Sequence, residues 1–240
     1  MIRMAKPFLV QAGSAQFAFV DPPAALYKFF RQKAHADALA KRGEVRIGTL
    51  YDFRAQEGLD RVRGDAGEGQ FTITLESSQP ETITAENAPW YLKEQVAAMG
   101  MPIFSHGGTI NAAGNYPDSY IFCTSYVRTA ALAADYGPYC VRIHHVVSFF
   151  TALSRHLTDD ICIASKEHFG ALGWCQYEDR SIKVTSATAE VPRNQPVAYI
   201  KKPERGDELE VRAVWYPAQP NPSARIVTCR ELTAFCSRVR

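Results

Sequence analysis

The stretch that decides the fold is DELEVRAVWY, residues Asp207 to Tyr216. Apolar side chains at every second position from Val211 alternate with Glu210 and Arg212, which is typical of a strand with one packed face. Side chains on a strand repeat every second residue, so Glu208, Glu210 and Arg212 are expected to point the same way. The two carboxylates would lie about 7 Å apart, with a guanidinium group beyond them.

This polar row has two interpretations. Charged side chains usually face water, so the row could be the solvated face of an edge strand. Alternatively, Arg212 could keep a neighbouring carboxylate ionised and oriented for chemistry.

Alternation and helical spacing elsewhere predict an α+β fold with a largely antiparallel or mixed sheet, because strands outnumber helices and come in groups. The predicted strands are 26–30, 44–50, 70–75, 119–127, 139–144, 161–165, 173–177, 181–185, 197–201 and 225–229. The predicted helices are 34–42, 89–99, 129–135, 146–157 and a short one from 231. The polar segment 51–69 is expected to be a long surface loop bordering the same cleft as Glu210, and glycine-rich 105–115 another loop.

Composition restricts the class of protein. The chain has 240 residues with no linker-like stretch, which favours one α+β domain over 1–240. A net charge of +2 is too small to indicate nucleic-acid binding by itself. No apolar run approaches the roughly 20 residues that span a bilayer. The six cysteines form no C-x-x-C pair, so we expect reduced thiols, a cytoplasmic location and no membrane partner.

The carboxylates could serve a metal ion instead. Asp65 and Glu68 of the polar segment, with Glu208 or Glu210, offer the oxygen ligands that Mg²⁺ prefers, which would suit a metal-dependent nuclease. No nuclease spacing is present, and a solvated, salt-bridged loop explains the same residues. We assign no metal site, and a metal-dependent nuclease stays the second alternative function.

Several short motifs follow one another in a recognisable order: LYKF from Leu26, IGTL-x-x-FR-x-x-E with D-x-x-EG, FCTSY, QYED, and KKP followed by E-x-E-x-R. Together they resemble a family of uncharacterised bacterial proteins, a domain of unknown function related to AbiGi-like abortive phage-infection proteins. The resemblance extends from Leu26 to Tyr216. That family in turn is similar to the ADP-ribosyltransferase fold, a split mixed sheet with flanking helices.

This resemblance implies an NAD site built from three strands. Lys28 or Tyr27 would help to hold NAD, and Ser125 or Tyr126 would support the nicotinamide ribose. Glu210 would act in catalysis, with Glu208 as the upstream carboxylate. Arg54 and Arg212 are further candidates for the NAD-binding site. Lys28 stands where Arg or His is usual, and FCTSY only loosely matches a Ser-Thr-Ser strand.

The implied chemistry explains these residue types. Cleavage of the nicotinamide–ribose bond builds an oxocarbenium-like charge, which an ionised carboxylate stabilises most in the transition state. The resemblance implies an NAD-dependent ADP-ribosyltransferase or NAD glycohydrolase in phage defence or toxin–antitoxin biology. A protein or nucleic-acid acceptor and an antitoxin or defence partner would accompany it. The alternative is a non-enzymatic ligand- or partner-binding protein on the same fold, because one fold hosts many functions.

Overall fold

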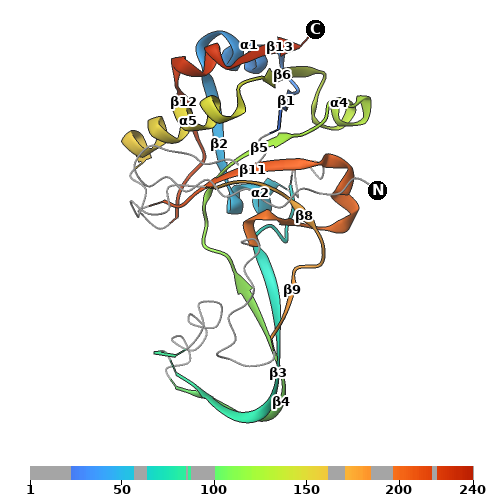
Figure 1. Ribbon diagram of the computed structural model, residues 1–240, viewed down its shortest axis with the longest axis vertical. Helices are drawn as coiled ribbons and strands as arrows, with labels where there is room; N and C mark the ends of the chain where they lie inside the picture. The colour runs from blue at the N-terminus through green and yellow to red at the C-terminus, as the bar shows by residue number, and fades with distance from the viewer. Residues whose placement is uncertain are drawn as a thin grey trace.

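The computed structural model describes residues 23–56, 64–84, 86–87, 101–161, 171–184, 197–217 and 221–239 (Figure 1). The strands are β1 Leu26–Phe30, β2 Glu44–Thr49, β3 Gln70–Ile83, β4 Ile103–Asn115, β5 Tyr120–Ser125, β6 Tyr139–Ile143, β7 Ala171–Trp174, β8 Gln176–Tyr177, β9 Ser181–Val184, β10 Ile200–Lys201, β11 Glu210–Trp215, β12 Arg225–Thr228 and β13 Cys236–Val239. The α-helices are α1 Lys33–Arg42, α2 Leu50–Gln56, α4 Ala130–Tyr136 and α5 Val146–Ile161, and the 3-10 helices are η1 Val197–Tyr199, η2 Pro203–Glu208 and η3 Arg230–Ala234. The fold is α+β with mostly antiparallel sheets.

The largest sheet has eight strands and forks at β5. Along one edge, β5 pairs with β11 over its whole length, from Glu210 opposite Ser125 to Trp215 opposite Tyr120. Its other edge is shared by two strands: β1 pairs with it only at Ser125, and β2 only at Tyr120 and Ile121. Between these two ends the sheet is split.

All six residues of β11 are buried, including the charged Glu210 and Arg212. Val211, Ala213 and Trp215 pack into the larger core, whereas Val214 packs into a second core on the opposite face. The predicted position of this strand, inside the sheet beside β5 with its apolar residues packed, is confirmed.

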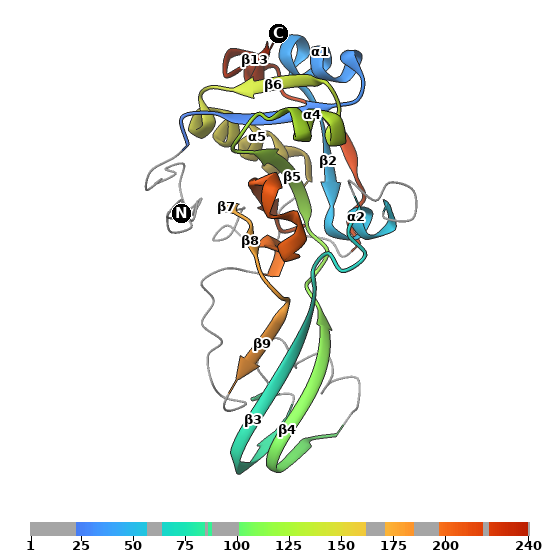
Figure 2. The same ribbon diagram turned by 90° about the vertical axis from the view of Figure 1, so that its right-hand side faces the viewer.

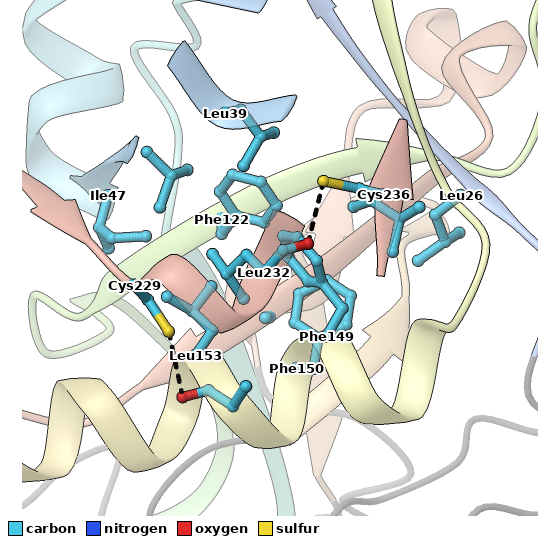
Figure 3. Close-up of a cluster of buried hydrophobic side chains, with 14 of the residues drawn as sticks. Leu26, Leu39, Ile47, Phe122, Phe149, Phe150, Leu153, Cys229, Leu232 and Cys236 are labelled. Atoms are coloured by element: carbon cyan, nitrogen blue, oxygen red, sulfur yellow. Dashed lines mark hydrogen bonds between the residues drawn. The ribbon is translucent and has the colours of Figure 1, made fainter. Parts of the chain in front are cut away.

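The larger core lies between the sheet and helices α1, α5 and η3 (Figure 3). Phe122 of β5 packs against Phe149 of α5, with ring centroids 6.1 Å apart. Leu39 of α1 and Leu232 of η3 are fully buried in the same cluster. The helical spacing predicted for α5 is confirmed, because its apolar side chains line one buried face.

Helix ends follow local chemistry. Gly43 ends α1 in the left-handed conformation, φ 67°, and its N–H bonds back to Leu39. A Cβ at Gly43 would meet the carbonyl oxygen of Cys229 at 1.9 Å, so two separate requirements select glycine there. Thr129 caps α4 by accepting a hydrogen bond from the N–H of Leu132.

Strands β3, β4 and β9 form a separate sheet that projects from the body as an arm (Figures 1 and 2). The prediction of a loop over 105–115 is wrong, because β4 pairs with β3 from Asn115 to Ile103, with one shift of register between Ser77 and Pro80. Glycines weaken a strand but do not prevent pairing beside a long partner.

Other boundaries also differ from the sequence predictions. Residues 51–56 of the predicted surface loop form all of helix α2 except its first residue, Leu50. Residues 197–199 form η1, so only the last two residues of that predicted strand are extended. A short helix near the C terminus is present as η3, and β13 follows it without having been predicted. The helix expected at 89–99 and most of the strand at 161–165 fall outside the described residues.

None of the described helices combines the length and apolar character needed to cross a membrane.

Candidate functional site

A cavity of about 570 Å³ lies where the sheet forks. Its wall includes residues of β1 and β2 on the two sides of the fork, of β5 at its base and of β11 beyond. The polar and charged residues that line it are Tyr27, Lys28, Arg31, Gln32, His35, Glu44, Arg46, Asp65, Glu68, Cys123, Thr124, Ser125, Tyr136, Lys201, Arg205, Glu208, Glu210 and Arg212.

A row of predicted site residues crosses three strands at this cavity. Ser125 lies directly opposite Tyr27 on one side and Glu210 on the other. Residues directly opposite each other share a face of the sheet, so register alone brings these side chains together. The Ser125 hydroxyl donates a 2.7 Å hydrogen bond to the carbonyl oxygen of Glu208 and accepts one from the N–H of Val127.

Lys28 lies in the split itself. Its ammonium group donates a 2.7 Å hydrogen bond to the carbonyl oxygen of Cys123, on the edge of β5 that neither β1 nor β2 covers at this point. The same group lies 4.7 Å from the centroid of the Phe122 ring. Lys28 therefore partly replaces a missing strand partner and also presents a cation to the cavity.

Glu210 is locked between two cations. One of its carboxylate oxygens lies 2.6 Å from the ammonium group of Lys201, and the other accepts a hydrogen bond from Arg212. The residue is only 7% exposed. Burial opposes ionisation, but the charges and hydrogen bonds of Arg212 and Lys201 outweigh it, so the pKa of Glu210 lies well below its ordinary value. The interpretation of this row as a solvated edge face is therefore wrong.

Glu208 also contacts Lys201, but it lies in a different element from Glu210. It ends η2, and Leu209 then adopts a left-handed conformation, φ 41°, before β11 begins. The expectation that Glu208 shares a regular strand with Glu210 is wrong at this point. Even so, its carboxylate binds the same Lys201 ammonium group and accepts a 3.1 Å hydrogen bond from Arg205.

The polar segment before β3 supplies two more buried acids. The guanidinium group of Arg212 donates hydrogen bonds of 2.6 and 2.9 Å to the two carboxylate oxygens of Glu68. Asp65 pairs with Arg180, with a shortest contact of 2.5 Å. Burial opposes ionisation of Asp65, but its hydrogen bond and ion pair with Arg180 prevail and lower its pKa. The prediction that this segment borders the cavity holds for Asp65 and Glu68, while 57–63 lie outside the described residues.

Two predicted NAD-binding residues do not line the cavity. Arg54 turns away: its guanidinium group donates to the backbone oxygen of Glu68 and to the side chain of Asn115. Tyr126 follows the last residue of β5, is 44% exposed and packs against Trp174 with centroids 4.7 Å apart. Strand alternation alone could not distinguish Tyr126 from Ser125, but the register with Glu210 does.

Sequence reasoning missed three side chains that contact the predicted carboxylates. Lys201 and Arg205 bind Glu208 directly. Tyr136, at the end of α4, hydrogen-bonds Glu208, and burial together with the nearby negative charge raises the pKa of its phenol. The KKP motif contains Lys201, but no periodicity marks it as a buried cation.

The four acids Asp65, Glu68, Glu208 and Glu210 are not arranged to hold a metal ion. In the described part of the chain, no group of three or more His, Cys, Asp or Glu side chains is placed to hold a metal ion. Asp65, Glu68, Glu208 and Glu210 each pair with an arginine or lysine instead.

Comparison with known proteins provides no family. Neither a family model, nor a curated protein, nor a solved structure gives a significant match to this chain.

Proposed function

We propose that this cavity binds NAD or a related nucleotide and that the protein cleaves the nicotinamide–ribose bond, as an ADP-ribosyltransferase or an NAD glycohydrolase. The observation that carries the proposal is the convergence of Lys28, Ser125 and Glu210, from three different strands, on one cavity. Its volume of about 570 Å³ lies within the range of small-molecule and cofactor sites. The fork at β5 further supports the split sheet of an ADP-ribosyltransferase-like fold.

The cavity has two chemically different walls. Lys28, Arg31 and Arg46 supply cations on β1, the following turn and β2, which suits the phosphates of a dinucleotide. Glu208 and Glu210, held by Lys201, Arg205 and Arg212, supply carboxylates on η2 and β11, which suits the charge that develops on the ribose.

The role of Glu210 in this reaction is electrostatic. Both of its oxygens already accept hydrogen bonds, and its lowered pKa keeps it ionised. It can therefore offer a fixed negative charge that needs no reorganisation, whereas it is poorly suited to accept a proton. Ser125, held by the backbone of Glu208, is placed to contact the ribose.

The resemblance to AbiGi-like proteins extends this proposal to phage defence or toxin–antitoxin biology. An acceptor of the ADP-ribosyl group, protein or nucleic acid, and an antitoxin or defence partner belong to the same proposal. The described cysteines are free thiols, which supports a reducing, cytoplasmic compartment.

A second candidate is a non-enzymatic protein that binds a nucleotide in the same cavity. The observation that favours it is the complete pairing of Glu210 with Lys201 and Arg212, which offsets the negative charge that catalysis would use.

One experiment separates the two candidates. Purified protein is incubated with NAD, nicotinamide release is followed by chromatography, and NAD binding is measured by calorimetry. Release that is lost in Glu210→Gln and kept in Glu231→Gln, whose side chain is 62% exposed on η3, supports the enzyme. Binding without release favours the non-enzymatic candidate, and the absence of both contradicts the NAD site.

A further inference from the structure

The buried charges around the cavity balance. The acids Asp65, Glu68, Glu208 and Glu210 face the bases Arg180, Lys201, Arg205 and Arg212, and every one of these side chains is less than a fifth exposed. Lys201 occupies a special place in this set, because it alone contacts both Glu208 and Glu210.

We propose that Lys201 is a positioning residue, whose ammonium group holds Glu208 and Glu210 together as a pair of ionised carboxylates. The two acids come from different elements, η2 and β11, and a left-handed residue separates them. Lys201 is therefore the common cation that brings their two carboxylates together. The catalytic meaning of this assignment rests on the proposed function, whereas the charge argument does not.

The position of Lys201 in the fold supports this role. The residue is 4% exposed and lies in β10, which pairs in parallel with β8. Burial disfavours its charged form, but the negative charges of Glu210 and Glu208 outweigh burial, so its pKa is raised. An ammonium group in this position is protonated at neutral pH.

The other titratable groups that face this cluster do not replace Lys201. Arg212 binds Glu210 from β11, and Arg205 binds Glu208 from η2, but each is shared with a second partner, Glu68 and the carbonyl oxygen of Gly64 respectively. The remaining neighbours are neutral groups whose pKa values burial raises: Cys123, Tyr136, Cys175 and Tyr177.

Replacing Lys201 by methionine keeps the stem and removes the charge. Three buried bases then face four acids, and the folded protein lowers the cost by binding a proton on the Glu208–Glu210 pair. The folded variant then holds a proton that the unfolded chain, whose carboxyls ionise at about pH 4, has already released, so its stability falls as pH rises until the folded protein loses that proton too. Within that window the folding constant should fall by up to about tenfold per pH unit.

The test measures urea unfolding from pH 5 to pH 8, and needs no NAD. Lys201→Met should become less stable relative to the wild-type protein as pH rises, whereas Lys201→Arg, which keeps the charge, should follow the wild type. Lys202→Met is the matched control, because Lys202 is 51% exposed and lies 3.8 Å from Asp65. The difference from wild type at each pH is the quantity to compare.

A double variant makes the test independent of whether Lys201→Met folds well. Lys201→Met with Glu208→Gln leaves three acids facing three bases, so it should be more stable than Lys201→Met at pH 8 and should regain the wild-type pH dependence. A double variant that is no more stable than the single one, or a Lys201→Met protein with wild-type pH dependence, would overturn the assignment. A wild-type protein that cleaves no NAD would contradict the proposed function and leave this result unaffected.

Discussion

Arg212 and Glu68 are 144 positions apart in the chain, and their side chains form a bidentate ion pair with hydrogen bonds of 2.6 and 2.9 Å. Each side chain is 2% exposed. The pair fastens the turn before β3 to the central strand β11, and so joins the base of the arm to the main sheet. Both residues line the cavity, so the pair also holds part of its wall.

Glu68→Ala tests the strength of this connection. Removing the acid leaves a buried guanidinium group with part of its hydrogen bonding lost, which typically costs about 3–5 kcal/mol. We expect a loss of that size in the free energy of urea unfolding at pH 7. Glu231→Ala is the control, because the Arg155–Glu231 pair is more than 60% exposed on both sides and should contribute less than about 1 kcal/mol. Equal effects of the two substitutions would contradict the buried connection.

The sequence predicts those parts of this arrangement that depend on neighbouring residues, and it does not predict those that depend on contacts between distant segments. Alternation predicts β2 and β11, and an aromatic run and an apolar run predict β1 and β5, because these patterns are local properties of each strand. The register that sets Ser125 opposite Glu210 follows only from tertiary pairing. The same holds for the fork, since nothing within β5 indicates that two strands share one of its edges.

The charge network was the least predictable feature. Glu210 and Arg212 lie two residues apart, and an interaction between them is expected from the sequence. Glu68 and Arg180, however, come from polar segments that resemble solvated loops, and Lys201 is the last residue of a predicted strand with nothing to mark it as buried. A charged residue in a polar segment is usually exposed, so burial of these side chains could be known only after the segments were placed around the sheet. The placement of Arg54 was unpredictable for the same reason. The sequence makes it a candidate for the cavity, but its guanidinium group donates to the backbone oxygen of Glu68 instead.

Acid sensitivity should follow from the carboxylates whose pKa values are lowered. Asp65 and Glu210 are both depressed in the folded protein, so they stabilise it above their unfolded pKa of about 4 and lose that contribution as pH falls towards their folded values. Stability should therefore decline below about pH 5. In Asp65→Asn, unfolding should be easier at pH 7 and the further loss between about pH 5 and pH 3 should be smaller than in the wild type. Parallel curves for the two proteins would count against the Asp65–Arg180 pair.

Lys28→Ala addresses ligand binding. The ammonium group faces the cavity, and a charge-assisted hydrogen bond to a phosphate is worth about 1.5–3 kcal/mol. The Kd for NAD, measured by calorimetry, should therefore rise roughly 10- to 150-fold. Lys41→Ala is the comparison, since Lys41 is 68% exposed on α1 and does not line the cavity. An unchanged Kd in Lys28→Ala, with protein that remains folded, would assign Lys28 to the sheet edge alone through its bond to Cys123.

Glu210→Gln should affect both stability and turnover. On a solvated face this substitution would hardly change folding, but Glu210 is buried between Lys201 and Arg212, and its neutralisation leaves their charges uncompensated. We expect a loss of about 3 kcal/mol in the free energy of unfolding. If the carboxylate stabilises the charge that develops on the ribose, kcat for nicotinamide release should fall roughly 100- to 1000-fold. The Kd for NAD should change little, because ground-state contacts are mostly retained.

The two effects of Glu210→Gln can be separated because they respond to different conditions. Assays at low temperature, with the folded fraction measured by circular dichroism, correct turnover for lost stability. Glu68→Ala provides the reference, since it weakens the same network but keeps the negative charge of Glu210. A fall in kcat that is much larger in Glu210→Gln than in Glu68→Ala, at equal folded fraction, identifies the charge itself as the catalytic contribution. Equal falls in the two variants would mean that Glu210 acts only by holding the wall of the cavity.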